Sequence, residues 1–108
     1  MRVLIFDENL MWAPRLAKSV TAFGHEAIVL SRLPDELPSG DVAIVNLSSR
    51  AMPPSQLVPM LRAAGIKVLA HAGHKETELL ELGKGLGCDR LVSNGEITNK
   101  IGKILEEF

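Results

Sequence analysis

The sequence predicts an α/β fold: one domain in which a doubly wound, five-stranded parallel sheet is covered by helices on both faces. Short runs of consecutive apolar residues recur along the chain, and segments with apolar residues three and four positions apart lie between most of them. Short unbroken apolar runs are typical of strands that are buried on both faces, and the wider spacing is typical of amphipathic helices. The length of 108 residues fits a single domain spanning 1–108.

The apolar runs place the expected strands at residues 3–6, 27–30, 42–45, 68–70 and 91–92. Expected helical segments carry apolar residues at Leu16, Val20 and Phe23; at Leu57, Met60, Leu61 and Ala64; at Leu79, Leu82 and Leu86; and at Ile101, Ile104, Leu105 and Phe108. Gly24, Gly65 and Gly87 follow three of these segments, where a helix commonly ends on a residue in the left-handed conformation. Strand–helix alternation of this kind predicts parallel strands joined by right-handed crossovers.

The connection between the second and third strands differs from the others. It runs from Ser31 to Gly40 and contains Pro34 and Pro38. Proline interrupts a helix because it lacks an N–H and clashes with the preceding turn, so at most one helical turn fits there. We therefore expect the crossover helix of this connection to be short or missing.

Charge and cysteine content exclude several classes of protein. Twelve basic and thirteen acidic residues give a net charge of −1, and no basic stripe is present, so we expect no nucleic-acid binding. The N-terminal apolar stretch ends at Asp7, too early for a signal peptide or a membrane span. Cys88, the only cysteine, cannot form an internal disulfide, which suits a reducing compartment. We expect a cytoplasmic protein that does not bind membranes.

Polar residues follow four of the expected strands. These are Asp7, Glu8 and Asn9; Asn46, Ser48 and Ser49; His71, Gly73 and His74; and Ser93, Asn94 and Gly95. In a doubly wound sheet, ligands bind outside the carboxyl ends of the strands. The sequence therefore predicts that any functional site lies at this edge of the sheet.

Several of these segments resemble the receiver domains of response regulators. The similarity rests on the acidic pair before Asn9, on Phe23-Gly24-His25-Glu26, on the third strand with its preceding Asp41, and on the approach to the fifth strand, Gly87-Cys88-Asp89-Arg90-Leu91-Val92. It covers essentially the whole chain. The resemblance implies a flavodoxin-like fold and a part in two-component signal transduction.

The resemblance also implies which residues occupy the family's active positions. Asp7 and Glu8 match the acids that bind a divalent metal, and Asn46 stands where receivers carry the aspartate that accepts a phosphoryl group. His71 (or Ala72) takes the position of a Thr or Ser, and Asn94 (or Ser93) that of a Lys.

These replacements predict a degenerate pocket formed by Asp7, Glu8, Asn46, His71 and Asn94. A carboxamide is a poor nucleophile, and the loss of a carboxylate and of the Lys weakens the hold on metal and on phosphate. We therefore expect a pseudo-receiver that is not an enzyme, has no catalytic residue and requires no cofactor, with at most weak Mg²⁺ binding by Asp7 and Glu8.

Other interpretations of the same residues stay open. Asp7 and Glu8 are either residual metal ligands or acids that end a strand facing water. Ser48 and Ser49, with the asparagines, either bind a phosphate-like ligand or hydrogen-bond one another. His71, His74 and Cys88 lack the clustered spacing of a structural zinc site. Trp12 is either half-buried packing or an exposed anchor for a partner.

The first functional hypothesis is a non-phosphorylatable module that binds a protein partner, or a second copy, through the face used by true receivers. That face consists of the helix containing Leu79, Leu82 and Leu86, the strand at 91–92 and the C-terminal helix. The alternatives are an atypical response regulator that still binds metal or phosphate, and a flavodoxin-like domain that binds a small ligand. An enzyme is the least supported class, since no Ser-His-Asp or Cys-His motif is present.

Overall fold

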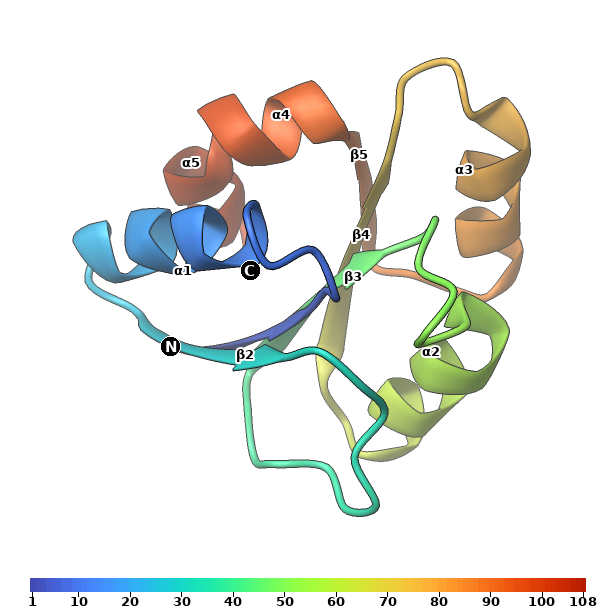
Figure 1. Cartoon of the computed structure of the whole chain (residues 1–108), viewed down its shortest axis with the longest axis horizontal. Coiled ribbons are helices and arrows are strands. Elements are labelled where there is room, and N and C mark those ends of the chain that lie inside the picture. The colour runs from blue at the N-terminus through green and yellow to red at the C-terminus, as the bar shows by residue number, and fades with distance from the viewer.

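The computed structural model describes all residues, 1–108, and contains a five-stranded sheet in the order β2-β1-β3-β4-β5 (Figure 1). All neighbouring strands are parallel, which confirms the predicted fold. The strands are β1 (Arg2–Phe6), β2 (Glu26–Leu30), β3 (Val42–Asn46), β4 (Lys67–Ala72) and β5 (Arg90–Ser93). The helices are α1 (Ala13–Ala22), α2 (Pro54–Ala63), α3 (Thr77–Gly85), α4 (Asn94–Asn99) and α5 (Ile101–Glu106).

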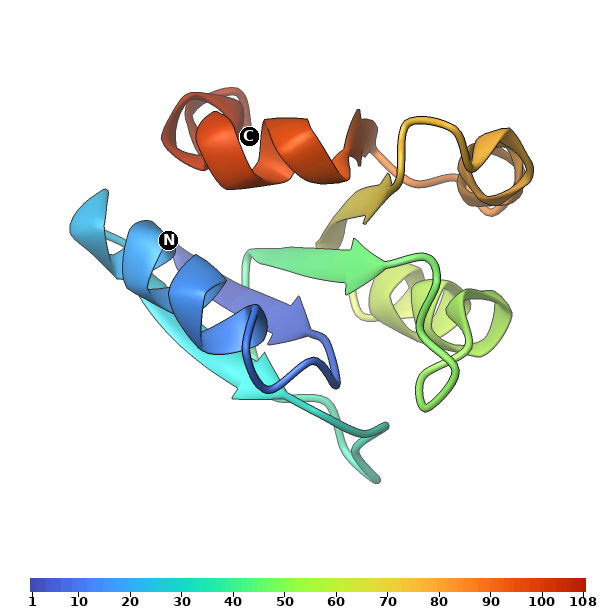
Figure 2. The same cartoon turned by 45° about the horizontal axis from the view of Figure 1, so that its top comes forward.

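The sheet separates two apolar clusters. Helices α2 and α3 cover one face, and α1, α4 and α5 cover the other (Figures 1 and 2). Leu4 and Phe6 of β1 point into the first cluster, whereas Val3 and Ile5 point into the second. Both faces of β1, β3 and β4 are buried in this way, which explains why these strands appear in the sequence as unbroken apolar runs.

Three helices end as the glycines predict. Gly24, Gly65 and Gly87 have φ angles of 87°, 75° and 82°, after α1, α2 and α3 respectively. A residue with a Cβ would be strained at such angles, so glycine is needed where the chain leaves each helix and turns toward the next strand.

The connection between β2 and β3 contains no helix, as predicted. Residues 31–41 form a loop on the side of the sheet that α2 and α3 cover (Figure 1). Leu33 and Leu37 pack against the first cluster from this loop. These two leucines supply the apolar cover that a crossover helix would otherwise provide for β1 and β2.

The C-terminal region differs from the prediction. The sequence predicted one helical segment after the last strand, with apolar residues from Ile101 to Phe108, but α4 already begins at Asn94 and a break at Lys100 separates α4 from α5. The helix starts early because the Ser93 hydroxyl accepts from the Glu96 N–H and the Glu96 carboxylate accepts from the Ser93 N–H, at 3.1 and 3.0 Å. Lys100, with φ −127°, ends it.

No helix in the chain combines the length and the apolar character that crossing a membrane requires.

Candidate functional site

Four of the polar residues expected at the sheet edge meet around one cleft. Asp7 follows β1, Asn46 ends β3, His71 lies near the end of β4 and Asn94 begins α4 after β5. The cleft has a volume of about 250 Å³, and Asn9 and Trp12 complete its lining. The parallel strands bring these residues together, because their carboxyl ends all lie at one edge.

Asp7 carries the only carboxylate that lines the cleft. It is 2% exposed. One carboxylate oxygen, Oδ1, accepts from the Asn9 N–H at 2.9 Å, and the other, Oδ2, accepts from the Asn46 side-chain amide at 3.2 Å. No Lys or Arg forms an ion pair with it. Two hydrogen bonds therefore stabilise a buried charge that has no counter-ion.

Both polar atoms of the Asn46 side chain form hydrogen bonds with neighbouring residues. Its amide nitrogen donates to Asp7, and its side-chain oxygen accepts from the Ser48 N–H and hydroxyl at 3.0 and 2.7 Å. A carboxylate at this position would place a second negative oxygen against that of Asp7. The amide instead supplies a donor, so this pair needs no cation to hold it together.

Glu8 does not line this cleft, although the sequence predicted that it forms the pocket together with Asp7 and Asn46. Its Oε2 accepts from the Ala51 N–H at 2.8 Å. A hydrogen bond from Ser49 lowers the pKa of Glu8 most, backbone N–H groups such as that of Ala51 lower it further, and burial opposes them. Glu8 thus fixes the loop after β3 instead of adding charge to the cleft.

His71 is 2% exposed and packs against the indole of Trp12, with ring centroids 4.9 Å apart at an angle of 42°. Burial lowers the pKa of His71, against the opposing effects of Asn94 and of the negative charge of Asp7. The imidazole is therefore held in its neutral form.

The side chain of Asn94 fixes which ring nitrogen of His71 carries the proton. With its amide nitrogen donating to His71 Nδ1 at 2.7 Å and to the Ala72 carbonyl at 3.3 Å, its oxygen accepts from the Gly73 N–H at 3.3 Å. All polar atoms of the Asn94 amide are then satisfied. In this arrangement the His71 proton lies on Nε2, which is buried and has no hydrogen-bond partner.

No three His, Cys, Asp or Glu side chains are grouped as metal ligands anywhere in the chain. Of the residues considered for zinc, His71 is buried and His74 exposed. Burial also raises the pKa of the Cys88 thiol to about 11, which keeps it protonated. The cleft presents hydrogen-bonding groups and one negative charge, without an assembled set of metal ligands.

Asn9 has a structural role that was not predicted from the sequence. Its side-chain oxygen accepts from the N–H groups of Met11 and Trp12, each at 3.0 Å, and so fixes the turn that leads into α1. An asparagine just before a helical segment is a known signal for such a turn. Through it, Trp12 is positioned against His71. Trp12 is half-buried and packs against the second cluster, whereas Met11 beside it is 83% exposed.

Solved structures similar to this chain are receiver domains. A response-regulator receiver domain protein from Clostridium thermocellum aligns with a TM-score of 0.82 and 12% identity, over 98% of this chain and 91% of that one. The chemotaxis response regulator CheY4 of Vibrio cholerae aligns at 0.81 and 16%, over 98% and 96%. The receiver domain of the Francisella response regulator 1452 aligns at 0.75 and 16%, over 98% and 97%.

No protein-family model and no curated protein matches the sequence. At identities this low, the structural likeness establishes the fold, which is that of response-regulator receiver domains, over nearly the whole chain.

Proposed function

We propose that this chain is a receiver-like signalling module that is not phosphorylated at Asn46 and acts by binding a protein partner. The observation that supports this function is the Asn46 amide. It stands at the position corresponding to the phosphoacceptor of receiver domains and donates a hydrogen bond to the Asp7 carboxylate.

Acyl phosphate formation needs three groups, and each is compromised in this cleft. A carboxylate oxygen must attack phosphorus, and Asn46 has none to offer. A metal must neutralise the phosphoryl oxygens, but Glu8 is bonded to Ala51 and leaves Asp7 alone. A cation must hold the product, and Asn94 is neutral. The module accordingly needs no cofactor and is not an enzyme.

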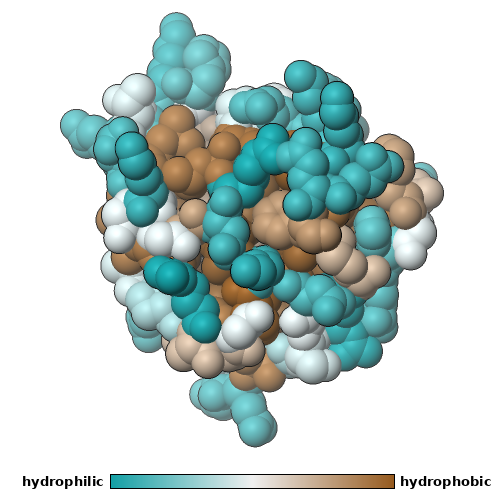
Figure 3. Space-filling view, turned by 180° about the vertical axis from the view of Figure 1, so that it is seen from behind, coloured by the Kyte–Doolittle hydropathy of each residue, from teal (hydrophilic) through white to brown (hydrophobic).

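The proposed partner surface consists of α3, β5 and α5. Leu82 on α3 is 39% exposed, and Leu79, Leu86 and Leu91 are partly buried near it. An ion pair between Arg90 and Glu107 ties β5 to the end of α5. Seen from behind the orientation of Figure 1, apolar surface emerges between hydrophilic side chains (Figure 3). An apolar centre with a charged rim is typical of protein interfaces.

Binding of a small polar ligand in the cleft is the second candidate function. The unpartnered Nε2 of His71 and the Asp7 carboxylate, which lacks a counter-ion, favour it. Such a ligand would accept a hydrogen bond from the imidazole and donate one to the carboxylate.

Incubation with acetyl phosphate and magnesium tests the proposed function. Intact mass spectrometry should show no phosphoryl adduct on the wild-type protein, because the Asn46 amide cannot form a mixed anhydride. Asn46→Asp should also give little adduct, since it supplies the nucleophile without the missing Lys. A phosphoryl mass shift in the wild type, mapped to Asp7 or Glu8, would replace this function with that of an atypical response regulator.

Magnesium titration followed by backbone NMR gives a second test. The wild type should show only weak, unsaturated shifts, because one carboxylate does not offset the dehydration of the ion. Asn46→Asp places a second carboxylate beside Asp7 and should bind clearly more tightly. Saturation of the wild type at sub-millimolar magnesium would contradict the account of the cleft given above.

A further inference from the structure

The cleft at the carboxyl ends of the strands contains a negative charge that no basic side chain neutralises. The Asp7 carboxylate forms no ion pair, and the hydrogen bonds that it accepts come from neutral amide groups of Asn9 and Asn46. A carboxylate has about four acceptor positions, so both oxygens of Asp7 can accept further hydrogen bonds. The group that best complements this carboxylate is a donor that carries a positive charge.

The other side-chain oxygens around the cleft are already in use. Those of Asn9, Asn46 and Asn94 each accept hydrogen bonds from N–H or O–H groups of nearby residues. A divalent metal ion takes about six or more oxygen ligands, which Asp7 alone does not supply. An organic cation needs fewer acceptors, because its carbon atoms can contact apolar and aromatic surface. The cleft therefore favours an organic cation over a metal ion.

Aromatic rings lie beside the carboxylate. The side chains of Trp12 and His71 both line the cleft, with their ring centroids 4.9 Å apart. The face of an indole ring attracts a cation, and aromatic side chains commonly surround organic ammonium groups in binding sites. His71 is held neutral by burial, so it adds no positive charge that would repel such a ligand. The lining thus suits an ammonium group attached to a short carbon chain.

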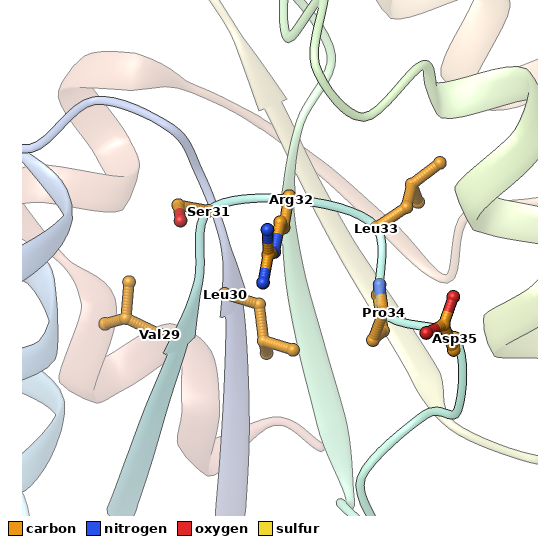
Figure 4. A pocket seen from close by; sticks show the side chains of 7 residues that line it. All are labelled: Val29, Leu30, Ser31, Arg32, Leu33, Pro34 and Asp35. Atoms are coloured by element: carbon orange, nitrogen blue, oxygen red, sulfur yellow. The ribbon is translucent and has the colours of Figure 1, made fainter.

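A larger groove at the end of β2 does not have these features. It has a volume of about 540 Å³ and is lined by consecutive residues, 29–35 (Figure 4). Its charged side chains, Arg32 and Asp35, are exposed and opposite in sign, and its lining includes no aromatic ring. Water screens exposed charges, whereas the Asp7 carboxylate is buried. The cleft at Asp7 is therefore the better site for a cation.

We propose that the cleft binds a small organic ammonium ion, whose N–H groups donate to the Asp7 carboxylate and whose carbon atoms lie against Trp12. This inference rests on the second candidate function and adds the charge and the chemical class of the ligand. An amino alcohol is one such ion, because its hydroxyl oxygen can also accept from the unpartnered Nε2 of His71. The cleft volume of about 250 Å³ accommodates a molecule of this size.

Titration of the full chain with ethanolamine at neutral pH and constant ionic strength tests the proposal. In ¹H–¹⁵N NMR spectra, the indole N–H of Trp12 and the backbone N–H of Asn9 should shift and reach saturation. Ethylene glycol has the same size, with a hydroxyl in place of the ammonium group, and should give no saturable shift. Inorganic phosphate should give none either, because its charge has the same sign as that of Asp7.

Two variants identify the carboxylate. Asp7→Asn keeps the shape of the side chain but removes its charge, and should weaken ethanolamine binding by about tenfold or more. The matched control is Glu8→Gln, which neutralises the adjacent acid outside the cleft and should bind as the wild type does. Circular dichroism verifies that both variants are folded.

The proposal is overturned if ethanolamine gives no saturable shift, if ethylene glycol binds equally well, or if binding survives Asp7→Asn. Saturation by phosphate and not by ethanolamine would exclude the ammonium ion and leave ligand binding in the cleft as a function. None of these results depends on phosphoryl transfer, so the signalling proposal fails or stands separately.

The ammonium group could belong to a free amine or to a lysine side chain of a protein, and a last titration distinguishes these sources. Nα-acetyl-lysine amide carries the same group on a peptide unit. Tighter binding than that of ethanolamine identifies a protein lysine, and equal or weaker binding identifies a free amine. Saturable binding of either compound that requires Asp7 supports the proposed ammonium site.

Discussion

Asp7 and His71 are both almost fully buried, yet they are stabilised in different ways. The Asp7 carboxylate accepts hydrogen bonds from the Asn9 N–H and the Asn46 side-chain amide. His71 stays neutral because burial disfavours the imidazolium, and its ring forms a hydrogen bond only through Nδ1. One side chain, Asn94, determines the position of the His71 proton, and one side chain, Asn46, compensates the charge of Asp7.

The low pKa of His71 predicts that stability declines on acidification. The folded chain takes up this proton at lower pH than the unfolded chain, whose imidazole has a pKa of about 6.5. The contribution of neutral His71 to the free energy of unfolding is complete above that pH. It is lost as the pH falls below it, by up to about 1.4 kcal/mol per pH unit. Thermal unfolding should therefore show a lower midpoint at about pH 5.5 than at about pH 7.5.

His71→Gln should flatten this dependence because it removes the titrating group. The control is His74→Gln, which changes an exposed histidine and should leave the slope as in the wild type. Equal slopes in His71→Gln and the wild type would show that another group causes the decline.

Among the elements, α3 approaches the sheet closely at one glycine. A Cβ at Gly83 would lie 2.6 Å from Cδ2 of Leu91 and 3.1 Å from Cδ1 of Leu47. Gly85, at the end of the same helix, has open space around its missing Cβ. The two glycines thus separate the effect of packing from that of helix propensity within one helix.

Gly83→Ala should lower the free energy of unfolding by about 1–3 kcal/mol, because Leu91 and Leu47 must move. Gly85→Ala should raise it by up to about 1 kcal/mol, since alanine stabilises a helix without a clash. Urea unfolding of both variants measures the difference. If both substitutions stabilise the protein, α3 does not pack as closely as the structure indicates.

The strands were predictable from the sequence because burial on both faces leaves unbroken apolar runs. The start of α4 was not predicted, because Ser93, Asn94 and Gly95 are individually turn-forming residues. The signal that was overlooked is the spacing from Ser93 to Glu96, which is that of a capping box.

For the candidate site, the predicted order of strands was enough to place Asp7, Asn46 and His71 at one edge of the sheet. The direction of Glu8 depends on a contact with Ala51 from a distant loop, which no local pattern encodes.

Across the whole molecule, the sheet is shared by both apolar clusters. Leu61 of α2 belongs to one cluster and Ile104 of α5 to the other, and β1, β3 and β4 contribute side chains to each. Neither layer of helices can leave without exposing a face of these strands to water. We therefore expect the two layers of helices to unfold in the same transition.

Urea unfolding followed by methyl NMR tests this expectation. The native signals of Leu61 and Ile104 should disappear with the same midpoint, because a small domain with one shared sheet unfolds in a single cooperative step. The far-UV circular dichroism transition, which reports on the backbone throughout, serves as the reference. Separate midpoints for the two residues would show that one layer of helices unfolds independently.

The contact between Trp12 and His71 gives the protein an internal optical probe. Trp12 is the only tryptophan, and its indole lies 4.9 Å from an imidazole that lines the cleft. Protonated imidazole quenches indole fluorescence, so the emission intensity records the charge of His71 without any label. A molecule that enters the cleft also changes the polarity around the indole. The emission wavelength and intensity of Trp12 thus report on the cleft at the carboxyl ends of the strands.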